Sequence, residues 1–340
     1  MIDRRALLRA GAAGFATTAA AAATVGAGAP AAVAASRADD RFDLSVPAVS
    51  YLREKPLHNE TIMQSFAFDD ANGRLFAIQL MEGGIQLPDE QAPVSGADRS
   101  ARGDLCLTRL SRTGSRLGHM YLRGFGHGAS MGVEPRGRTS YIWTEADANP
   151  ETGYGTAVAR FRYADGRVLD SHGPGVHKLY VVGGSTSNRP AVDMRHRRLL
   201  VQYLLGENDY RYRVLDLDRA KWGDTRGLYD LPRIGMADTE TPQGLALLGD
   251  YVYQMTGTHY TDESGTNPPS KRGDTYLSAI HLPTTRVVQR NRTEAAATLD
   301  YREPEGLAIQ LGASPPRLHI GFASGVAGAR TYTLCYQKQS

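Results

Sequence analysis

The segment Glu305-Gly-Leu-Ala-Ile-Gln310 contains a pattern that occurs five times along the chain. Each copy begins with a polar residue, continues with a small or turn-forming residue and includes a short apolar strand. The leading polar residues are 63, 62, 54 and 62 positions apart, which indicates a repeat architecture. The other four copies are Gln64-Ser-Phe-Ala-Phe-Asp69, His127-Gly-Ala-Ser-Met-Gly-Val133, Arg189-Pro-Ala-Val-Asp-Met194 and Gln243-Gly-Leu-Ala-Leu-Leu248.

Further strand-like segments follow each copy, and turn residues separate them. Second strands are expected to begin near Leu75, Tyr141, Leu199, Tyr251 and Leu318. Third strands are expected near Leu105, Ala157, Tyr212, Tyr276 and Thr331, and fourth strands near Leu117, Val168, Leu228 and Val287. Four short antiparallel strands about every 60 residues are typical of propeller blades. A β-sandwich, the alternative, does not explain the near-constant spacing.

The last repeat has no fourth strand of its own, and a spare strand at 42–53 precedes the first repeat. We expect this N-terminal strand to complete the fifth blade and so remove the exposed edges. The prediction is an all-β, five-bladed β-propeller with four antiparallel strands per blade, forming a single domain over 35–340. The blades are expected near 60–123, 124–186, 187–238, 239–300 and 301–340 with 42–53.

The N-terminal 34 residues read as a signal peptide. Paired arginines, Arg4 and Arg5, precede an Ala-rich run and the small-residue cleavage site Ala32-Val-Ala34, and the pair resembles a twin-arginine export signal. The alternative, a transmembrane anchor, is disfavoured because the run is short and rich in Ala and Gly. We expect a secreted protein, extracellular or associated with the cell wall, with no transmembrane segment after cleavage.

Composition and charge indicate which classes of partner the protein is expected to have. The chain has 340 residues, 41% of them hydrophobic and 22% charged, which suits one or two globular domains. Its formal charge of +3 falls to about +1 without the signal peptide, so no nucleic-acid partner is expected. We also expect a monomer. Cys106 and Cys335 fall on third strands of adjacent blades, too far apart for a disulfide, so two free thiols are expected.

In a propeller, the innermost strands begin and the second strands end at the same face of the molecule. The leading polar residues should therefore surround the mouth of the central channel. They are Gln64, His127, Arg189, Gln243 and Glu305. The alternative is that these side chains solvate a water-filled channel and pair among themselves, for example Arg189 with Glu305.

A second ring of polar and aromatic residues is expected from the loops around this mouth. It comprises Trp143, Glu145, Glu207, Tyr210 and His259, with Arg302 on the same rim. Aromatic faces interspersed with charged groups suit a sugar-binding cleft. Trp143 is the best stacking candidate, and packing between blades is its alternative role. No metal is expected, because Arg189 would place a fixed positive charge on the axis, and no cofactor-binding motif is present.

Three parts of the sequence resemble a known family. They are Gln64-Ser-Phe-Ala-Phe-Asp69; Gly126 to Glu134 with Tyr141-Ile-Trp-Thr-Glu145; and Glu303-Pro-Glu-Gly-Leu-Ala-Ile309 with Gly321-Phe-Ala-Ser-Gly325. These resemble the propeller domain shared by teichoic-acid-biosynthesis-protein-C-like proteins and a phage receptor-binding protein, over about 45–337. The resemblance implies a cell-surface or glycan context, and it transfers no catalytic residue.

The residues favour a carbohydrate-active protein that binds a cell-wall or environmental polysaccharide at the mouth, with cleavage as an open question. Hydrolysis usually needs two carboxyls about 5–10 Å apart, and the first ring offers only Glu305. A lyase needs a cation and a base, for which Arg189 and His127 fit by type, so lyase chemistry is slightly preferred. The alternative is a non-catalytic cell-surface glycan-binding or scaffold protein. Calcium-dependent nucleotide hydrolysis is disfavoured by Arg189.

Overall fold

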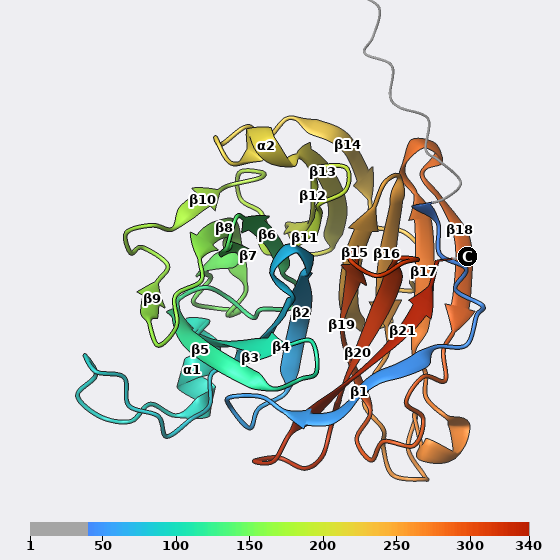
Figure 1. Cartoon of the computed structure of the whole chain (residues 1–340), viewed down its shortest axis with the longest axis horizontal. Coiled ribbons are helices and arrows are strands. Elements are labelled where there is room, and N and C mark those ends of the chain that lie inside the picture. Colours follow the sequence, from blue (N-terminus) through green and yellow to red (C-terminus); the bar gives the residue numbers. More distant parts are fainter. Residues whose placement is uncertain (1–39, 340) are drawn as a thin grey trace, which may run out of the picture. The chain divides into compact units, whose positions relative to one another are not determined.

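The computed structural model describes residues 40–339, and these form five β-sheets arranged around a central axis (Figure 1). The signal peptide expected at residues 1–34 lies outside the described residues. Four of the sheets have four strands and one has five. The prediction of an all-β, five-bladed propeller is confirmed.

The strands follow the predicted order in every repeat except at the outer position of the second blade. The innermost strands are β2 (Met63–Asp69), β6 (Gly132–Arg136), β11 (Thr186–Asp193), β15 (Pro242–Leu248) and β19 (Glu303–Gln310). The second strands are β3 (Arg74–Leu80), β7 (Thr139–Ala148), β12 (Arg198–Leu205), β16 (Tyr251–Thr256) and β20 (Arg317–Ser324). The third strands are β4 (Leu105–Ser111), β8 (Gly155–Arg162), β13 (Asp209–Asp216), β17 (Tyr276–His281) and β21 (Thr331–Lys338). The outer strands are β5 (Arg116–Arg123), β10 (His177–Leu179), β14 (Gly227–Pro232), β18 (Arg286–Arg292) and β1 (Val49–Pro56).

Helices are few and short, and they lie in the connections between strands. They are the α-helices α1 (Gly96–Arg102) and α2 (Leu217–Ala220), and the 3-10 turns η2 (Asp70–Asn72), η3 (Pro269–Lys271) and η4 (Leu282–Thr284). In the part of the chain that the structure describes, no helix has the length and apolar character needed to cross a bilayer.

The N-terminal strand closes the ring as expected. Strand β1 pairs antiparallel with β21, with Val49 opposite Tyr336 and Pro56 opposite Thr331. The fifth blade therefore has the order β1-β21-β20-β19 and contains strands from both ends of the described chain. This pairing covers the edge of β21 that would otherwise be open.

The second blade differs from the prediction, which placed its fourth strand near Val168. Strand β9 (Val168–Asp170) instead pairs in parallel with β5 of the first blade, and β10 takes the outer position beside β8. The turn before β9 explains the difference. Asp165 accepts a hydrogen bond from the backbone of His119 (2.9 Å), and Gly166 donates to the His119 carbonyl (2.7 Å), so the turn is attached to the first blade.

Apolar side chains fill the spaces between neighbouring blades, and apolar side chains also line the channel axis. A cavity of about 80 Å³ along the axis is lined by residues such as Ala67, Met131 and Leu245 from the innermost strands. Asp70 and Asp193 also line this cavity, so both apolar and polar groups face the axis. Cys106 and Cys335 are buried and free, as the blade geometry predicted.

Candidate functional site at the mouth of the channel

Arg189 lies near the start of β11, half-buried at the mouth. Its guanidinium carbon is 5.6 Å from the centre of the Tyr154 ring, and Nη1 donates a long hydrogen bond to the Pro242 carbonyl (3.4 Å). The buried Nε has no hydrogen-bond partner among the described residues, and Arg189 forms no ion pair there. The expected alternative, a direct pair with Glu305, is therefore not formed.

A second arginine, Arg233, lies beside this group and was not predicted from the sequence. It follows β14, and its guanidinium carbon stacks 3.7 Å from the centre of the Tyr210 ring. Its Nη1 is buried and has no partner within residues 40–339. Burial lowers the pKa of Arg233, and the positive charge of Arg189 lowers it further. The two half-buried guanidinium groups thus repel each other.

His127 faces the same group from the connection between β5 and β6. Its ring centre is 4.9 Å from that of Tyr154. Burial lowers the pKa of His127 to about 4, and the charge of Arg189 contributes to this shift. The imidazole is therefore neutral at neutral pH and can accept a proton.

Carboxyl groups line the other side of the mouth, at the start of β19. Glu305 is 5% exposed, and burial, together with the nearby charge of Glu303, raises its pKa well above the usual value, against the opposing effect of Arg189. Burial also raises the pKa of Glu303, whose Oε2 has no partner in the described structure. The charge of Arg189 affects the pKa of both His127 and Glu305, so the structure brings these three residues close together.

Comparison with known proteins shows which family this chain belongs to. A profile of the phage 5-bladed β-propeller receptor-binding platform domain matches residues 62–336. The chain belongs to this family.

Two proteins resemble this chain over most of its length. The putative major teichoic acid biosynthesis protein C of Bacillus subtilis (strain 168) is 27% identical over 308 residues, which cover 86% of this chain and 63% of that protein. The tail fibre of Staphylococcus aureus phage P68 superposes with a TM-score of 0.64 at 17% identity, covering 88% of this chain and 54% of that one. The chain thus spans less than two thirds of either protein, and the second likeness supports the fold alone.

Glu145 was expected on the rim of this platform domain, and the structure places it inside. Its carboxylate is 1% exposed and accepts hydrogen bonds from the backbone N–H groups of His127 (2.9 Å), Gly128 (2.6 Å) and Gly155 (2.6 Å). A Cβ at Gly126 would clash with this side chain, so the loop needs glycine there. Glu145 therefore positions the loops that carry His127 and Tyr154 and offers no free oxygen to a ligand.

Two other predicted binding residues also lie away from the mouth. Trp143 is 1% exposed and packs between the second and third blades with Val158 and Leu199, which is its alternative role. Arg302 is fully buried and donates to the backbone carbonyls of Ala295 and Thr293, both at 3.0 Å. Neither side chain has a face open to a sugar.

The remaining predicted residues are distributed around the mouth face. Gln64 is buried at the start of β2, and Gln243 donates to the carbonyl of Gly257 (3.3 Å). Glu207 is exposed in the turn between β12 and β13, and Tyr210 lies under Arg233. His259 stacks on Tyr301, with ring centres 4.8 Å apart, and its Nδ1 is 3.9 Å from Glu303. Residues 40–339 contain no group of three or more potential metal-binding side chains.

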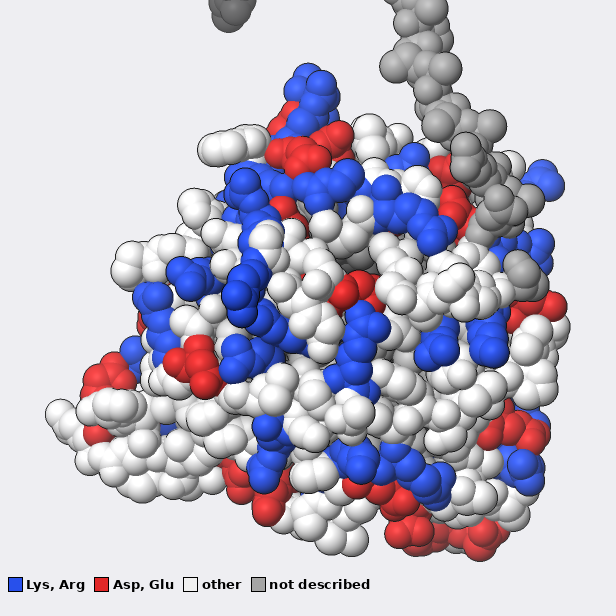
Figure 2. Space-filling model, viewed as in Figure 1, with Lys and Arg blue, Asp and Glu red and all other residues white. Residues whose placement is uncertain are grey.

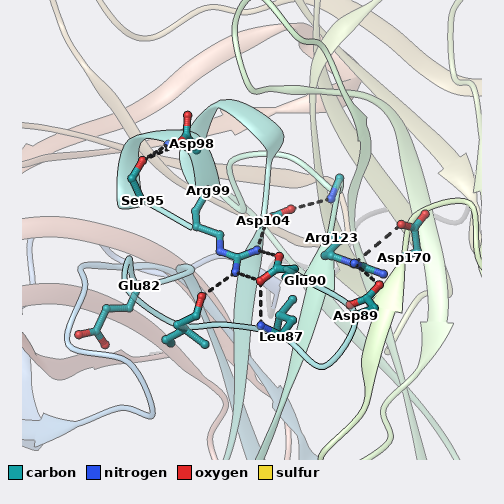
Figure 3. Close-up of polar contacts among 12 residues, drawn as sticks. Glu82, Leu87, Asp89, Glu90, Ser95, Asp98, Arg99, Asp104, Arg123 and Asp170 are labelled. Carbon is teal, nitrogen blue, oxygen red and sulfur yellow. Dashed lines mark hydrogen bonds and ion pairs between the residues drawn. The ribbon is translucent and has the colours of Figure 1, made fainter. Parts of the chain in front are cut away.

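A long insertion between β3 and β4 forms part of the rim of this family member. Figure 3 shows that it is built around Arg99, which pairs with Glu90 and with Asp104 (2.9 Å) and donates to the Ile85 carbonyl (2.9 Å). Arg123 links the insertion to β5 through Asp89 (2.6 Å). Open grooves of about 460 Å³ beside Arg123 and Asp147 and about 710 Å³ beside His259 and Tyr301 lie near the connections of this face.

Proposed function

We propose that this propeller binds an anionic glycan of a cell surface at the mouth of its channel, outside the cytoplasmic membrane. The observation that supports this most directly is the pair Arg189 and Arg233, each with a buried N–H group that has no partner and with no ion pair among the described residues. Other arginines with an unpartnered N–H group, such as Arg99 and Arg160, are each paired with a carboxylate. Buried polar groups are nearly always hydrogen-bonded, so unpaired ones suggest a ligand. Guanidinium groups bind phosphate and carboxylate well, often through two hydrogen bonds.

The surroundings of the two arginines suit a sugar. Tyr154 and Tyr210 lie against them, and such rings can stack on the C–H face of a pyranose. The names of the relatives, a teichoic acid biosynthesis protein and a phage tail fibre, agree with a ligand at the cell surface. The export signal expected from the N-terminal sequence agrees with a site outside the cytoplasmic membrane.

A second candidate function, elimination on a uronic-acid polymer, is favoured by the neutral state of His127. In this reaction His127 would remove the proton next to the sugar carboxylate, which Arg189 would neutralise. The electrons released would form a carbon–carbon double bond as the glycosidic C–O bond breaks. The leaving oxygen would take its proton from Glu305, whose raised pKa keeps it protonated.

Hydrolysis is less well supported by the same residues. It needs one ionised carboxylate and one protonated carboxyl at the scissile bond. Burial raises the pKa of both Glu303 and Glu305, and no ionised carboxylate partner is provided for them at the mouth. The preference for lyase chemistry over hydrolysis therefore remains part of the proposal.

The test measures binding and cleavage with the same samples. The full-length chain is titrated by calorimetry with teichoic acids, uronic-acid polymers and neutral glycans, while unsaturated products are followed by absorbance. We expect anionic polymers to bind, and Arg189→Ala or Arg233→Ala to weaken binding by at least about tenfold. Arg286→Ala, an exposed arginine on β18, is the control. Equal binding of neutral glycans, or an equal loss in the control, would contradict the proposal.

A further inference from the structure

The face opposite the mouth has an unbalanced group of charges around Glu134. This carboxylate is 1% exposed, at β6, and three cations surround it: Arg160 (2.8 Å), Lys221 (2.6 Å) and Arg197 (3.7 Å). Asp218 also pairs with Arg197 (2.5 Å) and with Lys221 (2.7 Å), so two carboxylates face three cations and the group keeps a net positive charge. The ion pair between Glu134 and Lys221 also attaches the turn containing α2 to the second blade.

Exposed arginines without carboxylate partners extend this group. Arg136 and Arg138 lie in the turn between β6 and β7, and Arg162 ends β8 beside that turn. None of the three forms an ion pair within the described residues. We call the following set the basic patch: Arg136, Arg138, Arg162, Arg197, Arg219 and Lys221. Figure 2 shows Lys and Arg gathered over the region where α2, β6 and β11 lie in Figure 1.

The basic patch is not visible in the sequence. Its members come from four separate places in the second and third blades, namely the β6–β7 turn, the end of β8, the β11–β12 turn and the β13–β14 connection, so no run of basic residues marks them. The overall charge of the chain is also close to neutral. Only the fold brings these cations onto one face, where they outnumber the carboxylates of Glu134 and Asp218.

Trp222 adds an apolar group at the edge of the basic patch. It is 90% exposed, next to Lys221, whereas Trp143, the other tryptophan of the chain, is 1% exposed. The turn that carries Trp222 is ordered by backbone hydrogen bonds, from Trp222 to Arg219 (2.9 Å) and from Gly223 to Ala220 (3.0 Å). A large aromatic side chain held out in solvent by a bonded turn has no packing role in the described structure.

We infer that this face docks on an anionic lipid bilayer, with Trp222 in the headgroup region and the basic patch against the lipid phosphates. Tryptophan favours the membrane interface, where its ring meets apolar chains and its N–H remains hydrated. Basic residues near an anionic leaflet add electrostatic attraction. A soluble polyanion would pair with the arginines but would offer Trp222 no apolar phase. Docking in this orientation leaves the mouth directed away from the bilayer.

The fluorescence of Trp222 can be used to test this inference. The full-length chain is titrated with phosphatidylglycerol vesicles and with phosphatidylcholine vesicles, and tryptophan emission and co-sedimentation are measured. We expect a blue shift with the anionic vesicles only, which Trp222→Phe abolishes because Trp143 is already buried. Arg136→Glu with Arg138→Glu should weaken partitioning by at least about tenfold, since each basic residue contributes appreciably near an anionic surface.

The control and the contrary outcomes separate the bilayer from other partners. Arg102→Glu with Arg286→Glu makes the same change of net charge at exposed positions outside the basic patch, and it should leave partitioning within about twofold of the wild type. Equal partitioning to both kinds of vesicle would overturn the inference. So would an unchanged emission of Trp222, or the same blue shift with soluble polyphosphate.

Discussion

Burial moves the pKa of individual side chains at the mouth away from the values that these groups have in water. Burial holds His127 neutral, and it keeps Glu305 protonated to a higher pH than an exposed glutamate. The positive charge of Arg189 acts on both groups. The mouth can therefore present a positive charge to an anionic ligand while its carboxyls are neutral, and this state depends on pH.

The affinity for anionic glycans should fall as the pH rises. Burial raises the pKa of Glu305, so it loses its proton above the usual range and then places a negative charge near Arg189. Burial also raises the pKa of Glu303, whose negative charge lies near Glu305. An ionised carboxylate there competes with the ligand, and we expect a loss of about tenfold across the titration. Calorimetry over a pH series checks this.

Glu305→Gln provides the matched variant for that series. The amide cannot ionise, so the fall in affinity should be smaller than in the wild type. An affinity that is independent of pH in the wild type, or an unchanged profile in Glu305→Gln, would show that these carboxyls do not face the ligand.

Connections between strands bring the residues of the mouth together, and Glu145 shows how. Its carboxylate accepts N–H groups from the β5–β6 connection and from the start of β8. Glu145→Ala should lower the free energy of unfolding by about 3 kcal/mol, because three buried donors lose their acceptor. It should also weaken glycan binding, because His127 and Tyr154 lose their fixed positions.

Chemical denaturation measures the first effect and calorimetry the second. Glu207→Ala, at an exposed turn, is the control and should change stability by less than about 0.5 kcal/mol. If Glu145→Ala were as stable as this control, the three hydrogen bonds would not hold the loops.

The sequence predicts the strands of this fold well, because alternating apolar residues and turn residues are local signals. It predicts less about which strand each turn joins. The Ala164-Asp-Gly turn correctly indicates a strand near Val168, but Asp165 bonds to His119 in the neighbouring blade, a long-range contact without a local signal. Arg233 was missed for a similar reason, since it follows an outer strand in the least regular repeat.

The burial of individual site residues is also hard to predict from the sequence, because it depends on long-range packing. Arg189 and Glu305 lie near the starts of innermost strands, which are a local signal in the sequence. Trp143 and Glu145 stand on a predicted second strand, yet the side of the strand that each faces depends on packing between blades, and both are buried.

The whole propeller depends on its ring being closed by β1. Leu52 of β1 is buried, and it packs with Leu110 of the first blade and Leu334 of the fifth. Because Leu52 contacts both blades, its loss should loosen the contact between them and the pairing of β1 with β21 together. The mouth, which lies where the blades meet, should be affected as well.

Leu52→Ala should therefore destabilise the protein by about 2–5 kcal/mol and speed amide exchange in β21 and in the first blade together. Denaturation and hydrogen exchange of the full chain measure the two effects. Val49→Ala is the control, because Val49 lies in the same strand but is exposed. Faster exchange confined to β1, with the first blade and β21 unchanged, would mean that the blades are stable without closure and that the ring is an arrangement of independent sheets.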